Sequence, residues 1–183
     1  KKPHLNRVNL ITGLNIDRRA KVNQKTRKER LVIVGAGMAG SRFAARVQSE
    51  FPDRFSITLI GEEKEVGYNR ILLSSFLAQE CGLEELALID VEHFLEKQGV
   101  VMSANPVIDI DVHAKQVRLQ DGVSLYFDTL VIATGSRSSR LPVKGADSHN
   151  VIGFRDLQDI SIMTHLNPES RVVVIGGGLL GLE

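Results

Sequence analysis

A glycine-rich turn between a buried strand and a helix constrains the fold of this sequence more than any other feature. Residues 31–34 form a short apolar run, and Gly35, Gly37 and Gly40 follow it in the spacing G-x-G-x-x-G. An apolar pattern of helical period then covers residues 38–50. The first glycine permits the tight turn, the second lets a pyrophosphate approach the backbone, and the third lets the helix pack closely against the strand. Because the N-terminus of a helix also attracts phosphate, we predict a nucleotide-binding α/β fold of the Rossmann type.

A second strand and an acidic pair complete this motif. Residues 56–60 predict a strand parallel to the first, since the helix between them makes a right-handed crossover. Glu63, beside Glu62, follows the last glycine of the turn by 23 residues, where an acidic side chain binds the hydroxyls of a ribose. No arginine lies in residues 61–67, so the site suits an unphosphorylated ribose, as in FAD or NAD. The alternative is a glycine-rich turn that only packs.

The rest of the chain alternates between helical and strand patterns. We predict helices at residues 69–80, 91–98 (with Asp90 as N-cap and Gly99 closing it) and 156–166. Residues 107–112, 116–119 and 123–126 alternate in polarity and predict a small antiparallel meander. Residues 129–133 and 171–175 are apolar runs that predict two further buried strands.

The second of these runs leads into another glycine motif. Gly176, Gly178 and Gly181 repeat the spacing of the first turn 141 residues further along. Packing alone is again the alternative, but two such motifs favour a protein that binds two dinucleotides. A flavin and a nicotinamide are the natural pair, because hydride passes readily between them. We therefore expect a basic leader at residues 1–30, an FAD-binding domain at 31–150, and a connection with the start of an NAD(P)H-binding domain at 151–183.

The charges are distributed unevenly. Residues 1–30 contain ten basic and two acidic side chains, a net charge of +8, whereas the remainder carries −7. A nucleic-acid arm would need aromatic residues for stacking on bases, and this segment has none. A transit peptide is a further alternative, although the segment has no serine. The simplest expectation is a solvated, flexible leader that binds no nucleic acid.

Composition excludes several other classes. A single cysteine, Cys81, excludes a disulfide scaffold and dithiol chemistry, and the longest uncharged runs are too short to cross a membrane. These features favour the cytoplasm. The five histidines show no ligand spacing, so we expect no metal site in these residues.

From residue 31 onward the chain resembles the FAD-dependent pyridine-nucleotide oxidoreductases. The resemblance rests on residues 35–40, Glu63, the segment 129–135 and the segment 173–183. Within that group, residues 68–74 (Tyr-Asn-Arg-Ile-Leu-Leu-Ser) and 77–80 are similar to the N-terminal region of the NAD(P)H-dependent nitrite reductase large subunit. Rubredoxin and ferredoxin reductases are close relatives.

The resemblance implies roles for matching positions. The residues expected at the FAD are Gly35, Ala36, Gly37, Met38, Ala39, Gly40, Glu62, Glu63, Asn69, Arg70, Ser74, Val107, Ala133, Thr134, Gly135 and Arg137. Gly176, Gly178 and Gly181 would begin the NAD(P)H site, and Glu183 would be the catalytic residue near the contact of nicotinamide and flavin.

Several functions remain open at this point. The first is an electron-input module in which NAD(P)H reduces FAD and electrons pass to a further redox domain, with an iron–sulfur cluster and sirohaem in a downstream part that reduces nitrite. The second is a stand-alone rubredoxin or ferredoxin reductase serving a small carrier protein; Ser75 disfavours it, because many ferredoxin reductases have lysine there. A non-catalytic flavin-binding protein is the third, and a homodimer is left open for each. We expect residues 1–183 alone to be inactive.

Overall fold

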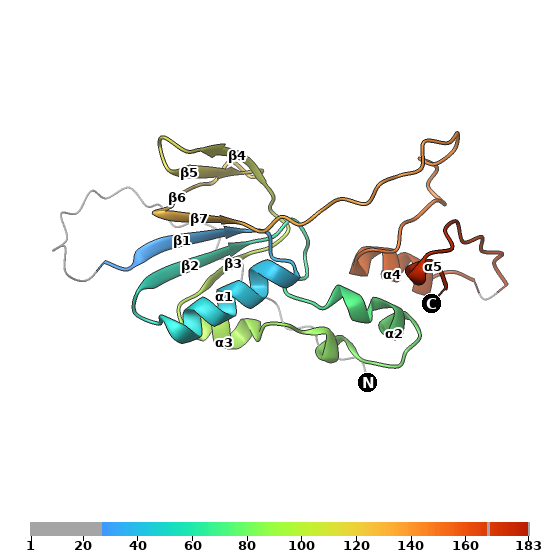
Figure 1. Cartoon of the computed structure of the whole chain (residues 1–183), viewed down its shortest axis with the longest axis horizontal. Helices are drawn as coiled ribbons and strands as arrows, with labels where there is room; N and C mark the ends of the chain where they lie inside the picture. Colours follow the sequence, from blue (N-terminus) through green and yellow to red (C-terminus); the bar gives the residue numbers. More distant parts are fainter. Residues whose placement is uncertain (1–26, 168, 183) are drawn as a thin grey trace.

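A four-stranded parallel sheet forms the centre of the molecule. The computed structural model describes residues 27–167 and 169–182. Its main sheet has the order β3-β2-β1-β7, from β1 (Glu29–Val34), β2 (Phe55–Ile60), β3 (Val100–Met102) and β7 (Thr129–Ile132). A separate antiparallel sheet contains β4 (Val107–Asp111), β5 (Gln116–Leu119) and β6 (Ser124–Tyr126). The predicted Rossmann-like sheet with an antiparallel meander is therefore confirmed (Figure 1).

Five α-helices and two short 3-10 helices are assigned among the described residues. They are α1 (Met38–Glu50), η1 (Arg70–Leu72), α2 (Leu73–Leu77), η2 (Leu83–Leu86), α3 (Val91–Glu96), α4 (Leu157–Thr164) and α5 (Leu179–Leu182). None of the described helices is long and apolar enough to cross a membrane.

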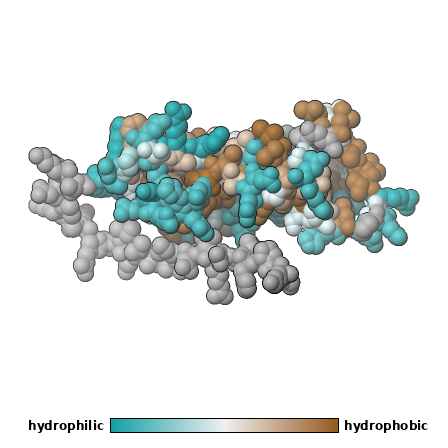
Figure 2. Space-filling view, turned by 90° about the horizontal axis from the view of Figure 1, so that it is seen from below, coloured by the Kyte–Doolittle hydropathy of each residue, from teal (hydrophilic) through white to brown (hydrophobic). Residues whose placement is uncertain are grey.

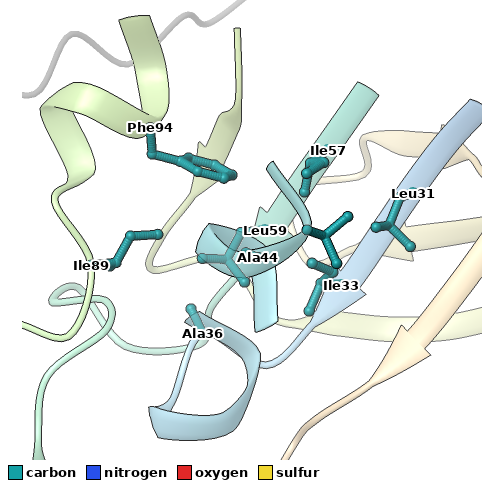
Figure 3. Close-up of a cluster of buried hydrophobic side chains, with 9 residues drawn as sticks. Leu31, Ile33, Ala36, Ala44, Ile57, Leu59, Ile89 and Phe94 are labelled. Atoms are coloured by element: carbon teal, nitrogen blue, oxygen red, sulfur yellow. The ribbon is translucent and has the colours of Figure 1, made fainter. Parts of the chain in front are cut away.

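The alternation of side chains along β1 explains why residues 31–34 of this strand are all apolar. Leu31 and Ile33 pack into one core with Ala44 of α1 and Phe94 of α3 (Figure 3). The intervening Val32 and Val34 pack into a second core with the meander residues Val117 and Leu119 and with Phe127. Both faces of the sheet are therefore covered at residues 31–34, as expected for an uninterrupted apolar run.

The helix predicted at residues 69–80 is shorter than expected. The side chain of Asn69 accepts a hydrogen bond from the N–H of Ile71 and caps η1, and α2 ends at Leu77. Gln79 then adopts a left-handed conformation with φ of 62°, which ends the helical path. The helix predicted at residues 91–98 likewise ends at Glu96, with Gln98 at φ of 65°. Its N-cap is confirmed, because Asp90 accepts from the N–H of His93 at 2.9 Å.

Two strand predictions need correction at their boundaries. β1 begins at Glu29, two residues earlier than expected, and Glu29 and Arg30 pair with β2. The end of the expected leader is therefore part of the sheet, while residues 1–26 lie outside the described residues. β3 was not predicted, because its three residues are too short to show a period.

The strand predicted at residues 171–175 is absent from the described structure. Val172, Val173, Val174 and Ile175 have exposed fractions between 66% and 83%, and no strand pairs with them among the described residues. An apolar run forms a strand only where a neighbouring strand supplies hydrogen-bond partners. The local sequence pattern does not show whether such a neighbour is present. The end of the molecule that carries α4 and α5 shows much apolar surface (Figure 2).

A third apolar cluster joins the middle of the chain to α4. Tyr68, Leu73, Leu86 and Ile160 are buried together, with Phe154 and Leu157 packed against them. This cluster fixes residues 68–73 against residues 154–160, which are far apart in the sequence. The contact determines where the polar side chains described below meet.

Candidate dinucleotide site

The first glycine turn combines two tightly packed glycines with one that faces open space. A Cβ added to Gly35 would lie 2.2 Å from the carbonyl oxygen of Ala133, and one added to Gly40 would lie 1.9 Å from that of Gly35. Gly35 also has φ of 108°, which favours glycine. At Gly37, by contrast, an added Cβ would meet nothing within 4 Å. Gly37 directly precedes α1, whose first N–H groups have no partner within the helix. The turn therefore presents an open, hydrogen-bond-donating surface suited to a pyrophosphate.

Hydrogen bonds hold this turn at the carboxyl ends of three parallel strands. The N–H of Gly35 donates to the carbonyl oxygen of Ile60 at 2.8 Å, and the N–H of Ala133 donates to that of Val34 at 2.7 Å. In open α/β sheets ligands bind outside this edge. The predicted residues Ala36 and Ala133 thus lie together with the glycines at the end of β1 and β7.

The segment after β2, residues 61–67, packs against the first glycine turn at Ala36. The carbonyl oxygen of Ala36 accepts from the N–H of Gly67 and from the hydroxyl of Ser41, each at 2.9 Å. A Cβ on Gly61 would lie 2.8 Å from the Cβ of Ala36, so glycine permits this close approach. The two acidic residues that follow Gly61 are therefore carried to the edge of the glycine turn.

The two acidic residues have different surroundings. Glu62 is exposed and forms no hydrogen bond or ion pair with other described residues. Both carboxylate oxygens of Glu63 are engaged: Oε2 accepts from the hydroxyl of Tyr68 at 2.5 Å, and Oε1 pairs with Nη2 of Arg70. Burial and the hydrogen bond to Glu63 together raise the pKa of the Tyr68 hydroxyl well above its usual range. Of the two acids, only Glu62 offers a carboxylate without an existing partner.

Arg70 joins this cluster to a distant part of the chain. Its guanidinium lies 5.1 Å from the centre of the Tyr68 ring, and Nη1 donates to the carbonyl oxygen of Arg155 at 2.9 Å. The guanidinium of Arg155 in turn pairs with the carbonyl oxygen of Ser136, next to Gly135. The N–H of Arg155 donates to Oδ2 of Asp159 at 2.8 Å.

Sequence reasoning did not select Tyr68 and Arg155 as site residues. For Tyr68 the available signal was its place in the Tyr-Asn-Arg segment. The structure adds that Tyr68 is buried, and a buried tyrosine needs a partner for its hydroxyl. Nothing local indicated Arg155, because its role depends on the packing of α4 against α2.

The remaining predicted FAD residues lie at separate places. Thr134 and Arg137 are exposed after β7, and Val107 is half-buried at the start of β4. Asn69 caps η1, while Ser74 lies within α2. Gly135 has φ of 68° and would accept a Cβ only with strain.

The second glycine turn has the same local shape as the first. Gly176 has φ of 129°, a Cβ on Gly181 would lie 2.0 Å from the carbonyl oxygen of Gly176, and one on Gly178 would meet nothing within 4 Å. This turn leads into α5, which lies toward the end of the molecule away from the parallel sheet (Figure 1). Glu183 lies outside the described residues.

The structure also shows how the metal-ligating and thiol side chains are placed. No group of three or more histidine, cysteine or acidic side chains is placed to hold a metal ion there. Cys81 is half-buried and is the only cysteine of the sequence, so this chain contains no dithiol.

The parallel sheet and the glycine turn at its carboxyl edge define the Rossmann-type dinucleotide-binding class. Within that class the chain belongs to the pyridine nucleotide-disulphide oxidoreductase family, whose profile matches residues 29–183.

The chain is similar to proteins named as nitrate and nitrite reductase components. The chain is 38% identical over 159 residues to the assimilatory nitrate reductase electron transfer subunit of Bacillus subtilis (strain 168). The aligned region covers 86% of this chain and 20% of that protein. It is also 38% identical over 157 residues to the nitrite reductase [NAD(P)H] of the same organism, covering 85% and 20%. The chain thus spans about a fifth of the length of these curated relatives.

A solved structure shows the same fold. The putidaredoxin reductase in its covalent complex with putidaredoxin matches with a TM-score of 0.72 and 32% identity, covering 84% of this chain and 38% of that chain.

Proposed function

We propose that this chain is the FAD-binding part of an NAD(P)H-dependent oxidoreductase that passes electrons to a further redox centre. The observation that carries the proposal is the open space at Gly37, framed by the packed Gly35 and Gly40 at the N-terminus of α1. The backbone there can approach a pyrophosphate without any side chain between them. FAD, when bound, supplies the ability to take up a hydride and to release electrons one at a time.

The surrounding residues divide the work of holding FAD. The backbone of residues 35–40 receives the pyrophosphate. Glu63, whose side chain is 37% exposed, takes the adenosine ribose, and the exposed Glu62 lies beside it. The other residues expected at the cofactor are Asn69, Arg70, Ser74, Val107, Ala133, Thr134, Gly135 and Arg137. The second turn, at Gly176, Gly178 and Gly181, begins the NAD(P)H site, with Glu183 near the flavin.

Nitrite reduction is the function we favour for the complete protein. The relatives named nitrite reductase and nitrate reductase electron transfer subunit are the most similar of those reported above. Residues 1–183 contain one cysteine, so within them no dithiol takes electrons from the flavin. The iron–sulfur cluster and sirohaem of such an enzyme would belong to residues outside this chain. The structural likeness to putidaredoxin reductase supports the second candidate, a reductase for a small carrier protein.

The experiment is an anaerobic titration of the purified complete protein. We expect stoichiometric FAD, loss of the oxidised flavin absorbance on adding NADH or NADPH, and reoxidation by nitrite. Reoxidation by a rubredoxin or a ferredoxin, but not by nitrite, supports the second candidate. A protein that binds FAD without being reduced is a non-catalytic flavoprotein, and a Gly37→Val variant that retains FAD overturns the site.

A further inference from the structure

The segment that follows β7 runs along the carboxyl edge of the sheet with few contacts of its own. Residues 134–140 are all exposed. Among the described residues, their backbone forms no hydrogen bond with other backbone groups. A Cβ added to Gly135 would meet nothing within 4 Å. The backbone of this segment therefore does not fix its own path, although the segment carries Thr134, Gly135 and Arg137, which are expected at the FAD.

Two points nevertheless hold this segment. At its start Thr134 packs against the first glycine turn, because a Cβ on Gly35 would lie 2.8 Å from the backbone nitrogen of Thr134. At Ser136 the carbonyl oxygen accepts from Nη2 of Arg155, and the hydroxyl oxygen lies 3.5 Å from both Nη1 and Nη2. The first point belongs to the end of the strand. The second depends on one side chain that comes 19 residues later in the chain.

The backbone of Arg155 is held on both sides. Its carbonyl oxygen accepts from Nη1 of Arg70 at 2.9 Å, and its N–H donates to Oδ2 of Asp159 at 2.8 Å. The next residue, Asp156, caps α4 by accepting from the N–H of Asp159 at 2.9 Å. None of these contacts uses the guanidinium of Arg155. The guanidinium therefore extends from a fixed point, and its replacement leaves the backbone contacts in place.

The contact between Arg155 and Ser136 also closes a long loop. Residues 137–154 lie between the two, and most of them are exposed. Figure 1 shows this part of the chain leaving β7 and returning to α4. Holding the ends of such a loop together costs conformational entropy, so a specific contact is needed to keep them in place. Without the guanidinium, the packing at Thr134 alone would restrain the segment next to the glycine turn.

We propose that Arg155 is a positioning residue, which holds residues 134–137 at the carboxyl edge of the sheet in the path that the flavin nucleotide requires. The proposal rests on the proposed function, because three of these four residues are expected at the FAD. Arg155 acts through this segment and makes no contact with the cofactor. A segment that is ordered before binding lowers the entropy lost when the cofactor binds.

The first test measures the order of this segment in the apo form of the complete protein. Trypsin cleaves after Arg137, which directly follows Ser136, and mass spectrometry identifies the site of cleavage. We expect Arg155→Gln to speed this cleavage at least about fivefold, because proteolysis requires a segment to leave its folded position. Cleavage after the exposed Lys115, in the turn between β4 and β5, reports the stability of the domain and stays unchanged.

Three further variants isolate the role of the guanidinium. Arg118→Gln is the matched control, because it makes the same substitution in an exposed pair with Asp109, and it leaves cleavage after Arg137 unchanged. Ser136→Ala keeps the carbonyl oxygen that Arg155 binds, so it also leaves this cleavage unchanged. Arg155→Lys keeps a charged donor without the planar fork and restores slow cleavage in part.

The second test measures the affinity of the same proteins for FAD. We expect Arg155→Gln to raise the dissociation constant of FAD about tenfold, because the released segment must be ordered again when the cofactor binds. Arg155→Lys gives an intermediate dissociation constant. Arg118→Gln binds FAD as the wild type does.

Three outcomes overturn the proposal. The first is cleavage after Arg137 that is as slow in Arg155→Gln as in the wild type. The second is an equal rise in cleavage after Arg137 and Lys115, which means that Arg155 only stabilises the domain. The third is faster cleavage after Arg137 with an unchanged dissociation constant of FAD. A wild-type protein that binds no FAD contradicts the proposed function instead, and cleavage of the apo form still decides whether Arg155 holds the segment.

Discussion

The guanidinium of Arg30 in β1 forms a two-point ion pair with the carboxylate of Asp128, 98 residues later in the chain. Nε lies 2.9 Å from Oδ2 and Nη2 lies 2.8 Å from Oδ1, while the backbone N–H of Arg30 also donates to Oδ2 at 2.8 Å. Asp128 directly precedes β7, so the pair fixes the start of that strand beside β1. A residue expected in a flexible leader is therefore part of the parallel sheet.

We expect Asp128→Asn to destabilise the protein by about 1–2 kcal/mol, because three charge-assisted hydrogen bonds are weakened together. Urea denaturation followed by circular dichroism measures the change. Asp109→Asn is the control: its single contact to Arg118 joins two exposed side chains and is worth at most about 0.5 kcal/mol. Equal effects of the two substitutions would contradict the role assigned to Asp128.

The same pair predicts a dependence of stability on pH. Hydrogen bonds from Arg30 hold the pKa of Asp128 below its ordinary value of about 3.9. In acid the unfolded chain takes up a proton at Asp128 before the folded chain does, so this contribution is complete above about pH 5 and is lost as the pH falls below about 4. Urea denaturation at pH 3, 4 and 6 should show a steeper loss in the wild type than in Asp128→Asn. Parallel profiles would show that the pair does not survive in solution.

Alanine at two glycines of the first turn should separate folding from cofactor binding. Gly40→Ala places a methyl group 1.9 Å from the carbonyl oxygen of Gly35, and we expect a loss of about 2–3 kcal/mol of stability. Gly37→Ala meets open space and should leave stability within about 0.5 kcal/mol. Its methyl group nevertheless points into the space proposed for the pyrophosphate, so FAD should bind at least about tenfold more weakly.

Thermal unfolding of the apo protein measures the stability of these two variants, and fluorescence titration with FAD measures their affinity for the cofactor. Unfolding of Gly37→Ala at the same temperature as Gly40→Ala would refute the difference in packing. Unchanged FAD binding by Gly37→Ala would place the pyrophosphate elsewhere.

The core on the α1 side of the sheet offers a fourth prediction. Phe94 is 1% exposed, and a Cβ on Gly99 would lie 2.4 Å from its ring, so the ring packs closely against the backbone of Gly99. We expect Phe94→Ala to cost about 3–5 kcal/mol. Phe43→Ala in α1 removes a side chain that is 41% exposed and should cost about 1 kcal/mol. Chemical denaturation of both variants measures the loss in free energy of unfolding. Similar losses would contradict the close packing of Phe94 in this core (Figure 3).

The sequence by itself determined those features whose cause is local. The order strand, glycine turn, helix and strand at residues 29–60 follows from a short apolar run, three spaced glycines and a helical period. The second glycine turn shows the same effect, because its loop closes as the first does although no strand within residues 27–167 and 169–182 pairs with the run before it. The alternation of β4, β5 and β6 and the cap at Asp90 are equally local.

The tertiary structure alone decided which residues meet across the chain. A strand depends on neighbours, so in the part of the chain that the structure describes residues 171–175 have no paired strand, and β3 forms from three residues that show no period. The sequence predicts Glu63 as the ribose acid, and only the tertiary structure shows that its carboxylate also contacts Tyr68 and Arg70. Hydrogen-bond partners such as Arg70 with the Arg155 carbonyl, or Arg30 with Asp128, are separated by 85 and 98 residues. Local periodicity carries no information about such distances, because it reports which face of an element is buried and not what is buried against it.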